Sequence, residues 1–154
     1  AGMQKTIADV VEAACEMSRT KWGAIIVMER DTGLRDYAAT GTDLDATVST
    51  PLLLSLFMPS SPLHDGAVIV RGNRIVAAGC VLPLSDNISA NSEYGTRHRA
   101  ALGISEQTDA VSVIVSEETG IVSLAHSGRM MRPLNAEKLT RILSALFRVQ
   151  RREE

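Results

Sequence analysis

A histidine and an aspartate stand side by side in the segment Pro62-Leu63-His64-Asp65-Gly66-Ala67, between a proline-containing loop and an apolar run. A carboxylate at the end of a loop can bind a divalent cation or act as a general base. Gly66 allows a ligand or another stretch of backbone to come close. The pair Asp65-Gly66 is also typical of an ordinary turn, so this segment alone leaves a chemical and a purely structural interpretation open.

Two arginines flank a histidine in the segment Tyr94-Gly95-Thr96-Arg97-His98-Arg99-Ala100, where a helix is predicted to begin. The first turn of a helix has free backbone N–H groups and the positive end of the helix dipole, and both favour an anion. Arginine adds bidentate contacts to phosphate. Cations at this end of a helix are unfavourable without an anionic ligand, so the segment indicates phosphate binding. The alternative is a solvated helix start with surface arginines.

Two adjacent acids and a serine follow an apolar strand in Val115-Ser116-Glu117-Glu118-Thr119-Gly120. One of the acids could complete a cation site with His64 or Asp65. A polar turn between two strands explains the same residues equally well. His126 stands alone near a Ser-Gly turn and is expected at the surface.

The composition excludes several functional classes. A net charge of −2, with 16 basic and 18 acidic residues, argues against a general nucleic-acid or membrane-surface binder, and 3% aromatic residues argues against base stacking. The sequence contains no GxGxxG, Walker A or GxSxG motif. Cys15 and Cys80 are far apart and in apolar surroundings, so we expect free, buried thiols and a reducing compartment.

The elements that must position these segments follow from hydrophobic periodicity, caps and turns. Helices are predicted over residues 6–19, with Thr6 as cap, over 51–57 after Ser49-Thr50, over 96–106, and after a cap at Asn135. Strands are predicted over 22–28, 67–70, 75–82, 111–115 and 121–124. The hairpin turns at Gly72-Asn73 and Glu117–Gly120 imply antiparallel pairs. We therefore expect one α/β domain, over residues 3–150, with a mixed sheet.

The paired segments Leu63-His64-Asp65-Gly66-Ala67 and Gly95-Thr96-Arg97-His98-Arg99 resemble the DGA and RHR motifs of diadenylate cyclase domains. The resemblance extends in order over about residues 6 to 146, through Glu29–Leu34, Leu82-Pro83-Leu84-Ser85, Ala101–Glu106 and Val115–Gly120. It implies a central mixed sheet with helices on both faces. It also implies that two domains meet face to face and join two ATP molecules into cyclic di-AMP, releasing two pyrophosphates.

The resemblance implies a role for each matching position. Asp65, with Gly66 and Ala67, matches the aspartate motif that positions a Mg²⁺ or Mn²⁺ ion and activates the ribose 3′-OH. Gly95, Thr96, Arg97, His98 and Arg99 match the phosphate-gripping segment, and Ser116 matches a phosphate-contacting serine. His64 and Glu118 match metal-binding positions, with Glu118 also at the nucleotide. The backbone of Leu82 matches the stretch that faces adenine.

Within the family the sequence is most similar to the membrane-anchored bacterial type. This resemblance implies transmembrane helices upstream, a location at the cytoplasmic face of the membrane for the full-length protein, and a soluble catalytic fragment here. Ala1 and Gly2, which precede Met3, are interpreted as a cloning remnant. Regulatory proteins are expected partners in this family, although no residue here identifies one.

Two positions depart from the family pattern. Members often carry an aromatic residue where this chain has Val81, and some have a hydroxyl residue where it has Ala100. Adenine recognition is therefore expected to be weaker or to depend on backbone contacts. Two alternatives to the enzyme remain: a catalytically silent nucleotide sensor on the same fold, and a structural module. The intact aspartate and RHR segment argue against the first, and three matching segments argue against the second.

Overall fold

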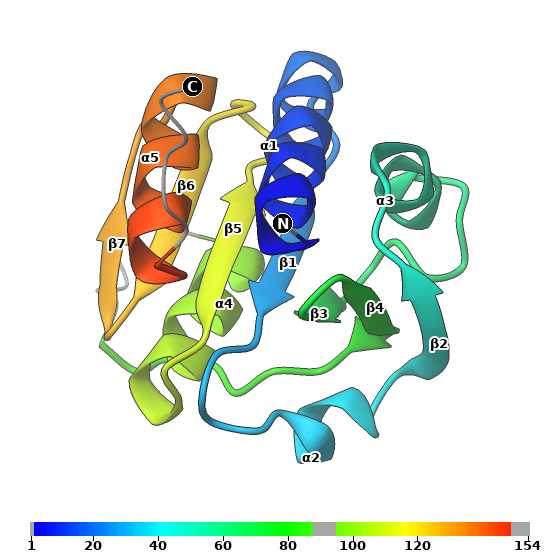
Figure 1. Ribbon diagram of the computed structural model, residues 1–154, viewed down its shortest axis with the longest axis vertical. Coiled ribbons are helices and arrows are strands. Elements are labelled where there is room, and N and C mark those ends of the chain that lie inside the picture. The colour runs from blue at the N-terminus through cyan, green and yellow to red at the C-terminus, as the bar shows by residue number, and fades with distance from the viewer. Residues whose placement is uncertain (1, 88–94, 149–154) are drawn as a thin grey trace.

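The computed structural model describes residues 2–87 and 95–148, which form a seven-stranded sheet with helices packed against it (Figure 1). The strands are β1 (Ala24–Met28), β2 (Thr42–Thr47), β3 (Ala67–Arg71), β4 (Arg74–Cys80), β5 (Val111–Val115), β6 (Val122–His126) and β7 (Arg129–Met131). The helices are α1 (Gly2–Thr20), α2 (Arg35–Ala38), α3 (Thr50–Phe57), α4 (Thr96–Gln107) and α5 (Ala136–Leu146).

The strand order β2-β4-β3-β1-β5-β6-β7 places β1 at the centre of the sheet. β1 runs parallel to β3, with Ile26 opposite Val68, and antiparallel to β5, with Ile26 opposite Val113. The remaining pairs, β2–β4, β3–β4, β5–β6 and β6–β7, are antiparallel. The sheet is therefore mixed, as the hairpin turns predicted.

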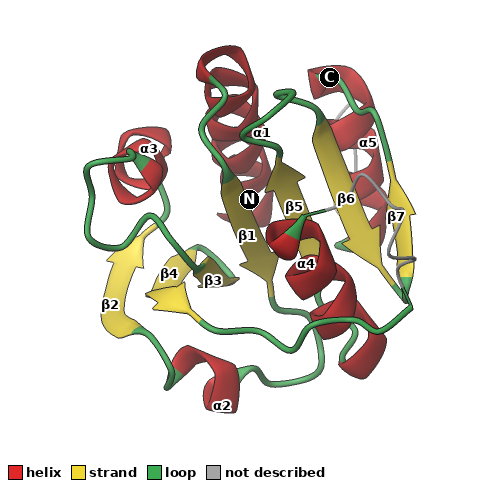
Figure 2. Cartoon of the chain, turned by 180° about the vertical axis from the view of Figure 1, so that it is seen from behind, coloured by secondary structure: helices red, strands yellow, loops and turns green. Residues whose placement is uncertain are grey.

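Every residue of β1 is buried, because both faces of the sheet are covered. Ile26 and Met28 belong to a core that α1, α3 and α5 close, while Ile25 and Val27 belong to a second core under α4 and α2. Figure 1 shows α1 and α5 in front of the sheet, and Figure 2 shows α4 on the opposite face. The prediction of one α/β domain fold with helices on both faces is confirmed.

The predicted caps have different outcomes. Ser49 accepts a hydrogen bond from the backbone N–H of Leu52, and Asn135 accepts one from Lys138, so both cap their helices. Thr6 does not cap α1, because the helix begins at Gly2 and the Thr6 hydroxyl donates to the Gly2 carbonyl four residues back. A threonine inside a helix can bond in this way, which the sequence pattern does not distinguish from a cap.

Three short elements were not predicted: α2, β2 and β7. β2 has the polar sequence TDLDAT and lies at an edge of the sheet, so no hydrophobic run indicates it. β7 has only three residues and forms the other edge. His126, expected at the surface, is half-buried at the end of β6, with Nε2 3.2 Å from Nη1 of Arg30. The sequence could not show that Arg30, 96 residues away, packs against this ring.

Both cysteines are free, as predicted; Cys80 is buried and Cys15 is half-buried. None of the helices in residues 2–87 and 95–148 has the length and apolar character that crossing a bilayer requires.

Candidate active site

A cavity of about 950 Å³ lies at the end of the sheet where β1 and β3 begin, where β4 and β5 end and where α4 starts. It brings together residues of all three segments that the sequence singled out. The described residues that line it are Ile25, His64, Asp65, Gly66, Ala67, Cys80, Val81, Leu82, Leu84, Gly95, Thr96, Arg97, His98, Ala100, Val115, Ser116, Glu117, Glu118, Thr119 and Arg132. Tyr94, quoted with the second segment, lies outside the described residues.

The aspartate segment enters the cavity where the loop before β3 ends. Asp65 is exposed, and within residues 2–87 and 95–148 no hydrogen bond or ion pair engages its carboxylate. Gly66 has φ of +139°, and a Cβ on it would lie 2.8 Å from the Cα of Gly79. Only glycine fits both the backbone conformation and the close approach to β4. Gly66 thus fixes the position at which Asp65 meets the cavity.

The ring of His64 is held in one tautomer. Its Nδ1 lies 2.7 Å from the carbonyl oxygen of Ser61, and because a carbonyl only accepts, Nδ1 carries the proton. Nε2 is then an acceptor in the neutral ring and can bind a cation. Metal-binding histidines commonly donate their second ring N–H to a backbone carbonyl in this way.

Arg97 is a mostly buried cation with one nitrogen paired and another without a partner among the described residues. Its side chain is only 20% exposed, and its Nη1 pairs at 3.1 Å with Oε1 of Glu117, from the turn after β5. Its Nε is buried without a hydrogen-bond partner among the described residues. A buried guanidinium N–H without a partner is costly, so its retention points to a ligand that would accept from it.

His98 and Arg132 lie near Arg97. His98 is buried, and this burial lowers the pKa of its imidazole below the ordinary value; the positive charges of Arg132 and Arg97 lower it further. The two arginines line the cavity together with the carboxylates of Asp65, Glu117 and Glu118. Cationic groups that can contact phosphate therefore share one cavity with carboxylates that can contact a cation.

Arg99 does not line the cavity with Arg97 and His98. Its Nε and Nη2 both lie 3.4 Å from the carbonyl oxygen of Ser85, and its own carbonyl accepts from the Ser85 N–H at 3.0 Å. In this chain Arg99 connects the first turns of α4 to the stretch after β4. The structure therefore separates two arginines that the sequence had given one role.

The stretch 82–85, predicted to face adenine, packs directly on α4. A Cβ on Gly103 would lie 1.9 Å from the carbonyl oxygen of Pro83, so helix and loop touch backbone to backbone. The Ser85 hydroxyl donates to Glu106 at 2.8 Å. Leu82 is buried within the cavity wall.

Ser116 closes the turn after β5 as well as lining the cavity. Its hydroxyl accepts from the backbone N–H groups of Glu118 and Thr119, both at 3.2 Å. The segment is thus a polar turn, as one interpretation predicted, and it also lines the cavity. Glu118 is exposed at the cavity, on the same wall as Glu117.

The described residues contain no group of three or more His, Cys, Asp or Glu side chains close enough to hold a metal ion together. His64, Asp65 and Glu118 line one cavity without forming a closed cage. A cation bound among them would have to take part of its coordination from water or from a ligand, as Mg²⁺ usually does.

Several residues at the site were not predicted from the sequence. Arg132 reaches it from beyond β7, and no local motif marks that position. Cys80 lines the cavity, and burial raises the pKa of its thiol to about 11, so it is not a nucleophile here. Val81 is 67% exposed, and its N–H is engaged by the Thr40 hydroxyl at 2.8 Å. The Val81 N–H is therefore already hydrogen-bonded within the chain.

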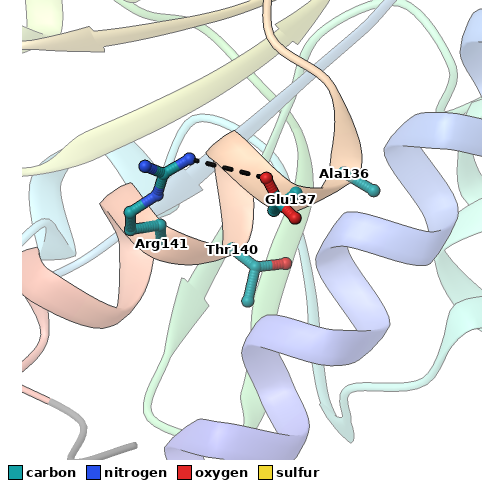
Figure 3. Close-up of a pocket in the computed structure, with 4 residues that line it drawn as sticks. All are labelled: Ala136, Glu137, Thr140 and Arg141. Atoms are coloured by element: carbon teal, nitrogen blue, oxygen red, sulfur yellow. Dashed lines mark ion pairs between the residues drawn. The ribbon is translucent and has the colours of Figure 1, made fainter.

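A second hollow, of about 460 Å³, lies on the first turns of α5 (Figure 3). It is lined by Ala136, Glu137, Thr140 and Arg141, and the ion pair drawn there joins Arg141 to Glu137 at 3.8 Å. Both charged side chains are more than half exposed, so this is a solvated helix surface and not a site for chemistry.

Known proteins are similar to this chain over most of its length. Residues 11–130 match the family model described as DisA bacterial checkpoint controller nucleotide-binding. The chain is 50% identical over 150 residues to the cyclic di-AMP synthase CdaA of Bacillus subtilis, covering 97% of this chain and 55% of that protein. It is 51% identical over 127 residues to a diadenylate cyclase of Listeria monocytogenes, covering 82% of this chain and 46% of that protein.

A solved structure is similar over nearly its full length. The crystal structure of DacA from Staphylococcus aureus, an N166C/T172C double mutant, superposes with a TM-score of 0.90 at 45% identity, covering 94% of this chain and 97% of that one. The chain spans about half the length of the two curated relatives named above.

Proposed function

The chain belongs to the diadenylate cyclase domain family, and on this premise we propose that it condenses two ATP molecules into cyclic di-AMP with release of two pyrophosphates. The observation that supports the proposal best is that the DGA and RHR segments meet in one cavity. An unengaged carboxylate on one wall lies in the same cavity as a partly unpaired guanidinium on another. This pair suits attack by a hydroxyl on a phosphate.

We propose distinct roles for the two walls. Asp65 takes up the proton of the ribose 3′-OH or holds it in position for attack on the α-phosphate of the other ATP. Arg97, Thr96 and the N–H groups at the start of α4 stabilise the negative charge that develops on that phosphate and on the leaving pyrophosphate. Ser116 adds a hydroxyl at the phosphates, and the backbone near Leu82 faces the base. No covalent enzyme intermediate is required.

We propose Mg²⁺ or Mn²⁺ as cofactor, held by Asp65, His64 and Glu118 together with substrate phosphate oxygens. When bound, the ion would supply charge neutralisation at the phosphates and lower the pKa of the attacking hydroxyl. The tautomer that Ser61 imposes on His64 leaves Nε2 available for this.

A single cavity holds one ATP in this proposal, so a homodimer is required to bring the second. Turnover should rise faster than linearly with protein concentration while the dimer is weak. Strict proportionality over a wide dilution range, without a preformed dimer in sedimentation, would argue against this requirement.

The decisive experiment is incubation of the purified protein with ATP and Mn²⁺ or Mg²⁺, with products separated by chromatography and identified by mass. Metal-dependent formation of cyclic di-AMP and pyrophosphate supports the proposal. ATP that binds and stays intact with each metal at high protein concentration would instead indicate a nucleotide sensor.

We also propose that the full-length protein is held at the cytoplasmic face of the bacterial membrane by a segment outside the chain described here. The proposal rests on the resemblance to the membrane-anchored type and on the greater length of the relatives. Fractionation of cells that express the full-length gene, with the protein detected in membrane and soluble fractions, tests it. Recovery in the soluble fraction alone would refute it.

A further inference from the structure

Gly23, immediately before β1, is a buried glycine that lies against the guanidinium of Arg97. A Cβ built on Gly23 would lie 2.5 Å from Cζ and Nη1 of Arg97 and 2.9 Å from its Nε. These three atoms are the nearest neighbours of that position. The guanidinium therefore rests on the main chain of Gly23, in space that a side chain would otherwise occupy.

Two further contacts define the position of this guanidinium. Glu117 holds Nη1 from the turn after β5, and Ala24 of β1 lies opposite Val115 of β5, so Gly23 and that turn are neighbours across the sheet. Nε remains buried and without a hydrogen-bond partner in the described residues. The guanidinium thus lies against Gly23 and is paired at Nη1, while its buried Nε–H is left to donate to a ligand.

We propose that Gly23 is a positioning residue for phosphate binding: its missing side chain allows the Arg97 guanidinium to lie at the depth in the cavity where its free N–H meets a nucleotide phosphate. The inference rests on the proposed nucleotide function of the same site. It explains why glycine stands there, since Gly23 has no left-handed backbone conformation that would demand it.

The substitution Gly23→Ala isolates this role. Ordinary carbon contacts need about 3.5 Å, so the guanidinium must move by about 1 Å, and the far end of an arginine can do so without unfolding the chain. A misplacement of about 1 Å in a catalytic group can cost about a hundredfold in rate. We expect Gly23→Ala to weaken ATP binding by about ten- to a hundredfold, as the loss of one charge-assisted hydrogen bond does. Binding of adenosine, which has no phosphate, should be unchanged.

A double-mutant cycle with Arg97→Ala separates positioning from general damage. If Gly23 acts through Arg97, Gly23→Ala should cost little further ATP affinity in the Arg97→Ala background. Gly33→Ala is the matched control, because nothing lies within 4 Å of a Cβ at Gly33 and its backbone is not left-handed. Calorimetric titration with ATP and adenosine, with a thermal melt of each variant, gives all of these values.

Each outcome decides the proposal. Unchanged ATP affinity in Gly23→Ala, equal losses for ATP and adenosine, or full additivity with Arg97→Ala would overturn it. Should Gly23→Ala not fold, recovery of folding in the double variant would support the contact, and failure to recover would refute it. If the natural protein binds ATP without forming cyclic di-AMP, the cyclase proposal fails while this cycle remains valid. If it binds no ATP, both proposals fail.

Discussion

The two ends of the central sheet use their polar residues in opposite ways. At the end away from the cavity, the carboxylate of Asp109 accepts from the backbone N–H groups of Asp31 and Thr32, at 3.0 and 2.9 Å. Glu29 accepts from the N–H of Leu34 at 3.0 Å in the same loop. We call this arrangement of residues 29–34 and Asp109 the loop clamp. The carboxylates of Asp109 and Glu29 are thus engaged by the chain's own backbone.

At the cavity end, Asp65 and the Nε of Arg97 lack such partners among the described residues. Polar groups that the chain satisfies stabilise the fold, whereas the buried, unpartnered Nε of Arg97 points to a ligand and the exposed carboxylate of Asp65 is open to one. We therefore expect substitutions at the cavity to lower the rate with little effect on the free energy of unfolding. Substitutions in the loop clamp should lower the free energy of unfolding with little effect on the rate. The following substitutions test this division.

The largest effect is expected for Asp65→Asn. Loss of the base should lower the rate of cyclic di-AMP formation by about 10²- to 10⁴-fold. The side chain is exposed, so the free energy of unfolding should change by no more than about 0.5 kcal/mol. Product formation and urea denaturation of the same preparation check both parts. Near-normal turnover would remove Asp65 from the mechanism.

The next largest effect on rate is expected at Arg97, and a smaller one at its neighbour Arg99. Arg97→Ala should lower the rate by about 10²- to 10³-fold, as removal of one transition-state donor does. Arg99→Ala should cost less in rate and more in stability, because its guanidinium faces the Ser85 carbonyl outside the cavity lining. Rates and unfolding curves for both variants, measured side by side, are the test. Equal losses of rate would return Arg99 to the phosphate-binding role that the sequence suggested.

The corresponding change in the loop clamp is Asp109→Ala. It leaves two backbone N–H groups without their acceptor, so we expect a loss of about 1–2 kcal/mol in the free energy of unfolding. Turnover by the molecules that remain folded should stay within about twofold of the natural protein, since the clamp lies at the far end of α4. A large loss of rate with an unchanged free energy of unfolding would show that the loop clamp serves activity as well as stability.

The loop clamp should also weaken in acid. Although burial raises the pKa of Asp109, hydrogen bonds from the backbone of Thr32 and Asp31 hold it below the ordinary value. The unfolded chain therefore binds this proton more readily, and the stabilisation is present above about pH 4 and lost as the pH falls through the native pKa. Urea denaturation between pH 6 and pH 3 should show a smaller decline in Asp109→Ala than in the natural protein. Equal declines would contradict it.

The smallest effect concerns His98 at the cavity. Its pKa lies below the ordinary value because of burial, Arg132 and Arg97. The neutral form is therefore favoured in the fold, and stability should decline as the pH falls below about 6.5 towards the native pKa. His98→Gln should flatten this part of the pH profile of unfolding. The pKa of His126 is also lowered, by burial and by Arg30, so His126→Gln should flatten the same part of the profile. An unchanged profile in His98→Gln would refute the prediction.

Much of the fold was predictable because its strands are short apolar runs with turn residues between them. The hairpin at Gly72-Asn73 and the caps at Ser49 and Asn135 illustrate this. β2 was not predictable, since an edge strand needs no apolar face and its polar sequence resembles a loop. The prediction of Thr6 as a helix cap was wrong because a threonine inside a helix and one at its start can stand in the same local sequence.

At the site, adjacent residues were predictable and distant ones were not. His64 and Asp65, like Arg97 and His98, are neighbours in sequence and carry recognisable chemistry. Arg132 reaches the cavity, and Gly23 reaches the side chain of Arg97, only through strand order and register, which no local pattern encodes. The separation of Arg97 from Arg99 depends on helix geometry: residues two apart face different directions.

Gly103 of α4 has no room for a side chain, because a Cβ there would lie 1.9 Å from the carbonyl oxygen of Pro83. The stretch after β4, which includes the cavity residues Leu82 and Leu84, therefore packs backbone to backbone on the helix whose first turn carries Arg97. We expect any larger residue at position 103 to push these two parts of the cavity lining apart, although it would touch neither the cavity nor its ligand.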